Sequence, residues 1–303
     1  VGAAPSQARG RPRSRRTLEG DNIDSGHYVV PTPIGNLEDI SLRAVSVLRA
    51  ADLIAAEDTR HSQRLLQHFS IDTPAVAYHD HSGERDLARI GDCLAGGGTV
   101  ALVSDAGTPL ISDPGYRLLR YVQSRGFAVH PVPGPCAAIA ALSVSGLPTD
   151  RFLFEGFLPA RAGAREKRLA ALAGESATLA FYEAPHRVQE SLQAMVETLG
   201  PQREAVLARE LTKTFETVRR GTLAELLDFV GADPNQQRGE IVLLVAGRER
   251  GGDALTPEMA GLLRRLAREL PARRAAAVVA DWAGLRRNDL YDYLLHSGEP
   301  PGD

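Results

Sequence analysis

Short apolar runs typical of strands alternate with segments of helical spacing from residue 27 onward. In residues 41–50, Leu42, Val45 and Leu48 fall on one helical face, and Ser41 stands at the N-cap position. In the first half of the chain we expect strands at residues 27–32, 52–56, 75–78, 99–104 and 128–132, and helices at 61–69, 84–94, 115–124 and 137–144. This alternation predicts parallel strands joined by helical crossovers.

A second series of strands and helices follows a plausible hinge at residues 148–150. Strands are expected at residues 152–157, 178–182, 205–209, 216–219 and 240–245, and helices at 164–172, 188–198 and 223–230. The strands at 205–209 and 216–219 have no long crossover between them, so this second sheet is expected to be mixed. A helix is then expected from residue 256 or 257, and residues 271–295 have helix-turn-helix spacing, which any small helical cap would also show.

The fold class that these patterns predict is α/β, with two α/β domains, a parallel sheet followed by a mixed sheet, and a small C-terminal helical cap. The expected boundaries are 1–26 for a disordered basic tail, 27–148 and 149–250 for the two domains, and 251–303 for the cap. The tail is rich in Gly, Pro, Ser and Arg. An arm that touches RNA phosphates and a plain solvated tail would both have this composition.

Composition narrows the class of protein. A formal net charge of −3 disfavours a protein that coats nucleic acid non-specifically. Cys93 and Cys136 stand outside any metal-type spacing. No apolar run approaches the roughly 20 residues of a membrane helix, and no apolar segment follows the basic N-terminus. We therefore expect no metal, no membrane partner and a cytoplasmic location.

Several catalytic motifs are absent from the sequence. It contains no G-x-G-x-x-G dinucleotide fingerprint, P-loop, H-E-x-x-H or G-x-S-x-G, and Gly96–Gly98 fall between a helix and a strand. These absences disfavour hydride transfer, nucleotide hydrolysis and metal catalysis.

Five loops rich in Gly, Pro and polar residues follow the predicted strands of the first sheet. They span residues 31–37, 57–61, 79–82, 104–115 and 133–138. Ligands of open α/β sheets bind at this edge. In the fourth loop Gly107 allows close approach of a ligand, although a rigid loop capped by Asp105 and Asp113 is the structural alternative.

These loops carry a family resemblance. PTPIGNL at residues 31–37, AEDTRH at 56–61 and SDAGTPLISDPG at 104–115 resemble the tetrapyrrole-methylase superfamily, and more narrowly its ribosomal RNA branch. GPCAA at 134–138, FEGFLP at 154–159, FYEAPHR at 181–187 and ARELTK at 208–213 agree. The likeness covers residues 27–247, and residues 273–295 are similar to the helix-turn-helix cap of that branch.

The resemblance implies a class III methyltransferase fold that binds folded S-adenosylmethionine between two α/β domains, and a homodimer. Small-molecule members usually have a Gly-rich first loop and a Gly-Asp-Pro loop, whereas this chain has Pro31 and Pro33 in the first loop and Gly107-Thr108-Pro109 in the fourth. This departure favours the RNA branch. Carried onto this sequence, the donor contacts would be Pro33, Ser104, Asp105, Gly107, Thr108, Ile111, Cys136, Ala137 and Tyr182.

Methyl transfer to a ribose hydroxyl should benefit from a base, because the hydroxyl is a weak nucleophile. The candidates are Glu57, Asp58, His79, Asp80, His81 and Glu183. Asp58 and His81 are favoured, followed by Glu57. For each acidic residue, a helix cap or a loop salt bridge is the alternative.

Basic side chains beside the matched loops could hold RNA phosphates. They are Arg60, Arg187, Arg209 and Lys213, and for Arg187 the alternative is an internal pair with Glu183 four residues earlier. The C-terminal arginines could dock RNA or belong to a solvated lid. The leading expectation is S-adenosylmethionine-dependent 2'-O-methylation of a cytidine ribose in the 16S ribosomal RNA of the small subunit. The alternatives are a small-molecule methylase and a non-catalytic ribosome-assembly module.

Overall fold

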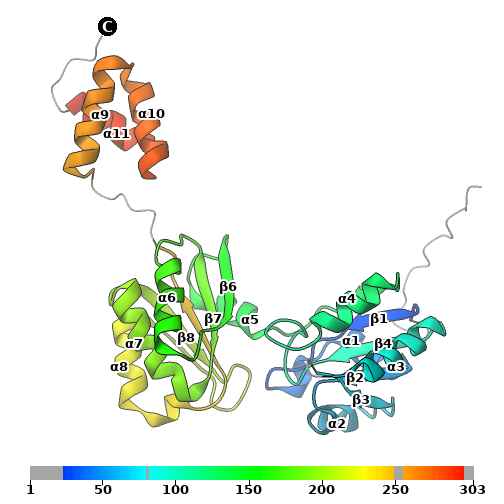
Figure 1. Ribbon diagram of the computed structural model, residues 1–303. Helices are drawn as coiled ribbons and strands as arrows, with labels where there is room; N and C mark the ends of the chain where they lie inside the picture. Colours follow the sequence, from blue (N-terminus) through cyan, green and yellow to red (C-terminus); the bar gives the residue numbers. More distant parts are fainter. Residues whose placement is uncertain (1–22, 80–81, 249–254, 297–303) are drawn as a thin grey trace, which may run out of the picture. The chain divides into compact units, whose positions relative to one another are not determined.

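The computed structural model describes residues 23–79, 82–248 and 255–296. The chain divides into two compact units between Cys136 and Ala137 (Figure 1). Because the described residues start at 23, the expected tail over residues 1–26 lies almost entirely outside them. The division between units precedes the expected hinge at 148–150 by one helix, because the helix at Ala137–Ser145 packs against strands of the second unit.

The first unit is built on a five-stranded sheet in the order β3-β2-β4-β1-β5. Its strands are β1 (Gly26–Val29), β2 (Leu53–Ala56), β3 (Ala75–Ala77), β4 (Thr99–Val103) and β5 (Val129–Pro131). Every neighbouring pair is parallel, which confirms the predicted parallel sheet. All five strands therefore end at the same edge.

Helices cover both faces of this sheet (Figure 1). They are η1 (Leu37–Asp39), α1 (Leu42–Ala50), α2 (Thr59–His68), α3 (Glu84–Ala95) and α4 (Tyr116–Ser124). Leu48 of α1 and Leu65 of α2 pack with Ile54 and Val103 on one face. Ile90 of α3 and Leu118 of α4 pack with Leu102 and other strand residues on the opposite face. Apolar side chains on both sides of each central strand make it a buried run rather than an alternating one.

The second unit contains a mixed sheet in the order β6-β7-β10-β8-β9. Its strands are β6 (Phe152–Phe157), β7 (Thr178–Glu183), β8 (Glu204–Arg209), β9 (Thr217–Thr222) and β10 (Ile241–Val245). β6 and β7 are parallel, whereas β10 is antiparallel to both β7 and β8, and β8 to β9. This arrangement confirms the mixed sheet that the short β8–β9 connection predicts.

Helices α6 (Ala162–Leu172), α7 (Val188–Leu199) and α8 (Leu223–Ala232) lie on one side of this sheet (Figure 1). Leu169, Leu192 and Leu226 from these helices share a core with Phe181 and Leu243 from the strands. Two short helices, η2 (Pro185–Arg187) and η3 (Pro234–Gln237), complete the loops. Helix α5 (Ala137–Ser145) packs against β7, β9 and β10, so it belongs to the second unit although it precedes the predicted hinge.

Three helices form the C-terminal part: α9 (Pro257–Glu269), α10 (Ala272–Ala283) and α11 (Arg287–His296). Thr256 is the N-cap of helix α9, and its side chain accepts the Met259 N–H, with Pro257 at the first helical position. Gly284 ends α10 in the left-handed conformation that glycine favours. The helices share a small core that includes Leu263, Ala276 and Leu290. The helical cap expected from the spacing is present. Within the described residues, no helix combines the length and apolar character needed to cross a membrane.

Candidate active site

The carboxyl edge of the first sheet brings three of the sequence-predicted loops together. β2, β4 and β1 are neighbours in the sheet, so the loops that follow them start side by side. The Asp58 N–H donates to the Asp105 carboxylate at 3.2 Å, and the Asp105 N–H donates to the Glu57 carboxylate at 3.3 Å. Residues 57–58 and the start of the 104–115 loop are thus joined by two hydrogen bonds.

The first and fourth loops are joined through Thr32 and Gly107. The Thr32 N–H donates to the Gly107 carbonyl at 2.8 Å, and the Gly107 N–H donates back to the Thr32 carbonyl at 3.1 Å. The Thr32 hydroxyl also donates to the Ser104 carbonyl at 3.1 Å. Gly107 is buried at φ +84°, and a Cβ there would lie 3.4 Å from Ile34 Cγ2. Only glycine takes up this backbone without strain.

The fourth loop fits a polar ligand at the sheet edge. The Ser104 hydroxyl is buried and has no hydrogen-bond partner in the described part of the chain. A buried hydroxyl without a partner is costly, and a bound ligand would supply one. The Thr108 hydroxyl donates a hydrogen bond to the Pro135 carbonyl at 2.8 Å, which joins the fourth loop to the fifth. Leu110 and Ser112 have φ +74° and +64°, so this loop also holds strained backbone of the kind found at ligand sites.

The expected donor contacts fall into two groups, one in each unit. In the first unit, Pro33 and Ile111 lie in the loops just described, together with Ser104, Asp105, Gly107 and Thr108, and Cys136 ends the unit half-buried. In the second unit the Tyr182 hydroxyl accepts the Ala138 N–H at 3.2 Å, which places this side chain beside the start of α5 and Ala137. The ring of Tyr182 also meets Phe154 and Phe157 edge-on.

Substituting Gly107 by alanine is expected to weaken binding of S-adenosylhomocysteine at least tenfold and to cost about 1–2 kcal/mol of stability, because it adds a side chain to a left-handed backbone at the sheet edge. Gly97 provides a matched control, since its φ is +81° and a Cβ there would meet nothing within 4 Å. Thermal unfolding and calorimetry of both alanine variants separate the two effects. Equal affinities in the two variants would exclude the 104–115 loop as a ligand site.

Asp58 is the N-cap of α2. Its carboxylate accepts the Arg60 N–H at 2.8 Å and pairs with the Arg60 guanidinium at 2.8 Å. The side-chain hydrogen bond from Arg60, followed by the backbone one, lowers the pKa of Asp58 to about 2. The structure shows the capping alternative for Asp58, and a carboxylate this acidic is a weak base at neutral pH; a catalytic role for Asp58 stays a prediction from the sequence.

The variant Asp58→Asn should therefore keep its methyl-transfer rate within about threefold, because Asn caps helices as well as Asp does. The folded-state pKa lies below the ordinary value of 3.8, so the capping contribution is present above that pH and is lost as the pH falls toward about 2. Methyl-transfer rates of Asp58→Asn and of the wild-type protein, measured between pH 6 and 9, check the threefold limit on the rate. A loss of 100-fold or more would reinstate Asp58 as the base.

The third loop gives less support to a catalytic role. His81, the other favoured base, and Asp80 lie outside the described residues. The flanking His79 is exposed, and its N–H donates to the Ser82 hydroxyl at 3.0 Å. Catalysis by His81 is thus an expectation from the sequence alone.

The four basic residues expected to bind RNA have different environments. The Arg60 side chain is 88% exposed and reaches solvent beside the sheet edge. Arg187 instead pairs with Glu183 at 2.8 Å, with the glutamate side chain fully buried, which is the internal pair that the spacing offered as an alternative. The Glu183 carboxylate also accepts the Ala184 N–H and the Ser191 hydroxyl.

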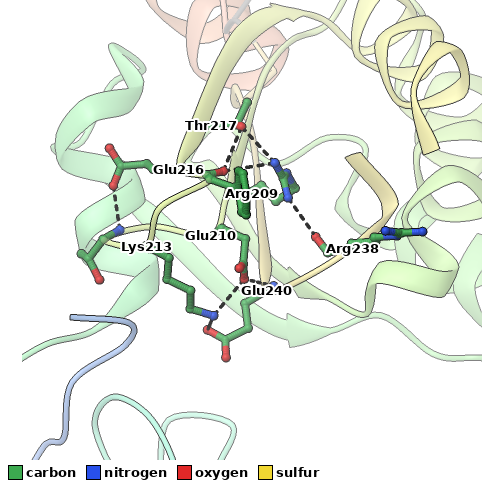
Figure 2. A network of polar contacts seen from close by, with 9 residues as sticks. Arg209, Glu210, Lys213, Glu216, Thr217, Arg238 and Glu240 are labelled. Atoms are coloured by element: carbon green, nitrogen blue, oxygen red, sulfur yellow. Dashed lines mark hydrogen bonds and ion pairs between the residues drawn. The ribbon is translucent and has the colours of Figure 1, made fainter. Parts of the chain in front are cut away.

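Arg209 and Lys213 are held in a polar network at the end of β8 (Figure 2). The buried guanidinium of Arg209 donates to Gln236 Oε1, to Thr217 Oγ1 and to the carbonyls of Arg238 and Phe215. Arg209 is therefore a structural residue, and the expectation that it engages phosphates is replaced by this role. The Lys213 ammonium lies 2.8 Å from Glu210 and 3.4 Å from Glu240. Burial alone would lower the pKa of Lys213, but hydrogen bonding to Glu210 and the charge of Glu240 raise it.

Two residues that hold these loops in place were not expected from the sequence. Thr32 joins the first and fourth loops, and its only sequence signal is its place in the 31–37 motif. Ser191 completes the Glu183 cluster from the first turns of α7, and nothing in a helical serine marks it in advance.

Comparisons with known proteins identify the family of this chain. The tetrapyrrole (corrin/porphyrin) methylases match residues 27–227, and the RsmI C-terminal HTH domain matches residues 253–297. The ribosomal RNA small subunit methyltransferase I of Pseudomonas aeruginosa is 57% identical over 88% of this chain and 96% of its own length. The Escherichia coli O157:H7 protein of the same name is 50% identical over 91% of this chain and 96% of its own length.

Solved structures share the fold at lower identity. A uroporphyrin-III-C-methyltransferase from Thermus thermophilus matches with a TM-score of 0.53 and 21% identity over 73% of this chain and 94% of that one. A diphthine synthase matches with a TM-score of 0.53 and 13% identity over 73% of this chain and 89% of that one. The sheet topology, the loop edge and these relatives together assign the chain to the tetrapyrrole methylase family of S-adenosylmethionine-dependent methyltransferases, in the branch of the ribosomal RNA small subunit methyltransferase I proteins.

Proposed function

We propose that this chain transfers a methyl group from S-adenosylmethionine to the 2'-hydroxyl of a cytidine ribose in the 16S RNA of the small ribosomal subunit. The observation that carries the proposal is 57% identity to a protein named for that subunit's RNA, over nearly the full length of both chains. The match to the helix-turn-helix domain over residues 253–297 supports an RNA substrate.

We propose that the donor is held by the 104–115 loop through Ser104, Asp105, Gly107, Thr108 and Ile111, with Pro33 from the first loop. Cys136, Ala137 and Tyr182 are proposed as the remaining contacts. The buried, unpartnered Ser104 hydroxyl and the left-handed backbone of Gly107 support this assignment. The donor supplies an activated methyl group on a sulfonium, so the protein mainly has to align it, which is worth roughly 7–11 kcal/mol of barrier.

Glu57 is the residue we propose for accepting the proton of the ribose hydroxyl. It is half-buried at the carboxyl end of β2 and accepts the Asp105 N–H, which fixes its carboxylate beside the proposed donor loop. The ribose oxygen forms a bond to the methyl carbon as the carbon–sulfur bond breaks, and the hydroxyl proton passes to Glu57. The products are the 2'-O-methylated cytidine and S-adenosylhomocysteine.

Phosphate contacts are proposed for the exposed Arg60 and for exposed arginines of α9–α11, whereas Lys213 and Arg187 would act mainly by holding their loops. Two further proposals accompany this function. One is a homodimer, and the other is a cytoplasmic location, where ribosomal subunits are assembled.

The test is transfer of labelled methyl groups from S-adenosylmethionine by the purified protein. The acceptors are small subunits from cells that lack the protein, bare 16S RNA, and a tetrapyrrole such as uroporphyrinogen III. We expect label in RNA of the small subunit and none in the tetrapyrrole. Label in the tetrapyrrole alone would favour the small-molecule reading. Donor binding with no label in any acceptor would favour a non-catalytic assembly role.

A further inference from the structure

The loop between β8 and β9 holds its backbone in a strained conformation. Glu210 has φ +51° and Thr212 has φ +66°. A left-handed backbone is a true outlier for a β-branched residue such as threonine. Of the five non-glycine residues with positive φ in the described residues, two lie in the proposed donor loop and two lie here. Strain of this kind persists where the surroundings fix it, and it is concentrated at functional sites.

A set of buried and half-buried polar contacts fixes this loop (Figure 2). Arg209, whose residue exposure is 7%, donates to the Phe215 carbonyl at 3.1 Å. The Thr217 hydroxyl donates to the same carbonyl at 3.2 Å, and the Glu216 carboxylate accepts the Thr212 N–H at 2.7 Å. A buried guanidinium is thus committed to the backbone of Phe215.

The base of the loop is anchored as firmly. Lys213 bridges Glu210 and Glu240, and the Glu240 N–H donates to the Glu210 carboxylate at 2.9 Å. Gly239, at φ +79°, passes so close to the Glu210 carboxylate that a Cβ there would overlap it. The loop backbone is held at both ends and in the middle, so the positions from which its exposed side chains project are fixed before any ligand arrives.

The side chain that this framework presents is Phe215. It is 72% exposed, among the highest values for a large apolar side chain in the described chain. Leaving a phenylalanine in water forgoes the stabilisation that its burial would give. An exposed aromatic ring on a fixed backbone is suited to receive a flat partner, because no backbone ordering is then needed on binding.

We propose that Phe215 stacks on an unpaired base of the small-subunit RNA that carries the methylated cytidine. This inference rests on the proposed function. Single-stranded RNA is recognised largely by stacking of splayed bases on aromatic side chains. Arg238 is exposed on the adjoining loop, and Arg209 donates to the carbonyls of both Arg238 and Phe215, so an RNA phosphate would find a cation on this neighbouring loop.

A protein partner fits this surface less well. Val218, 41% exposed, is the nearest exposed apolar side chain along β9, and the next residues, Arg219 and Arg220, are charged. The core of a protein interface is a largely apolar patch, and although arginine is common at such interfaces, the exposed apolar surface here is limited to Phe215 and Val218 along this loop and strand. One exposed ring with an exposed arginine on the adjoining loop instead matches a nucleotide, which offers one flat face and one negative charge.

The experiment compares Phe215→Ala, Phe215→Leu and Phe215→Trp in methyl transfer to small subunits from cells that lack the protein. Stacking on one base is worth an affinity factor of about 5- to 150-fold. We therefore expect Phe215→Ala to raise the KM for subunits about tenfold or more, with kcat changed less than threefold. Phe215→Leu should resemble alanine, whereas Phe215→Trp should restore the wild-type KM. Phe152→Ala, at the opposite end of the same sheet and 43% exposed, is the control and should leave KM unchanged.

Calorimetry with S-adenosylhomocysteine and light scattering complete the test. A wild-type KM in Phe215→Ala, a loss of donor affinity, or dissociation of an oligomer in step with the loss of activity would each overturn the stacking role. Full restoration by leucine would also overturn it, because leucine keeps the apolar surface and removes the ring face. Failure of the proposed function is distinct, since the wild-type protein would then label no small subunits.

Discussion

Replacing Glu183 by alanine is expected to lower the free energy of unfolding by about 3–5 kcal/mol. The carboxylate is fully buried and accepts hydrogen bonds from the Ala184 N–H at 2.7 Å, Arg187 at 2.8 Å and Ser191 at 2.5 Å. Its removal leaves a largely buried guanidinium and a buried hydroxyl without their acceptor. Urea denaturation followed by circular dichroism measures the change.

Two controls separate the buried pair from an ordinary carboxylate. Ser191→Ala removes one neutral donor and should cost about 1 kcal/mol. Glu197→Ala removes an exposed carboxylate of α7 and should stay within about 0.5 kcal/mol of the parent protein. If Glu183→Ala and Glu197→Ala were equally stable, the ion pair with Arg187 would not be holding the turn after β7, and Arg187 would be free for RNA.

Replacing Glu57 by glutamine is expected to lower kcat for methyl transfer by about 10²- to 10⁴-fold, the usual contribution of a positioned base. The amide is close in size to the carboxylate and its oxygen can still accept the Asp105 N–H, so the loop contact is preserved. What is lost is basicity toward the ribose hydroxyl. Single-turnover rates with saturating donor and subunits report this step.

The neighbouring Asp58→Asn variant is the matched control for Glu57→Gln, because it makes the same chemical change one residue away in a helix cap. Donor affinity measured by calorimetry should be unchanged in both variants. A full rate in Glu57→Gln would remove Glu57 from the mechanism and direct attention to His81.

The architecture could be predicted from the sequence because it depends on patterns that recur over many residues. The alternation of apolar runs and helical segments predicted that β1 to β5 are parallel, and parallel strands end at one edge, so the loops after β2 and β4 were expected at the same edge. The short connection between β8 and β9 likewise predicted the mixed sheet. The left-handed Gly284 ends α10 where the spacing placed a turn.

The roles of individual charged residues could not be predicted in the same way. Arg60 and Arg209 are both arginines in matched motifs. The Arg60 side chain is exposed, whereas Arg209 is buried and donates four hydrogen bonds. The difference arises from loop residues 215–217 and 236–238, whose oxygen atoms accept the hydrogen bonds from Arg209. Asp58 has spacing suited both to a cap and to a base; its contact with Arg60 shows the cap, and its role as a base stays a prediction. The strain at Thr212 has no sequence signature.

The most direct test of the account is the nucleoside composition of small-subunit RNA from cells that lack this protein, before and after the gene is restored. Mass spectrometry of digested 16S RNA should find 2'-O-methylcytidine lost from one site in the deletion strain. The wild-type gene should restore that nucleoside, and the Glu57→Gln gene should not. An unchanged content of 2'-O-methylcytidine in the deletion strain would contradict the account.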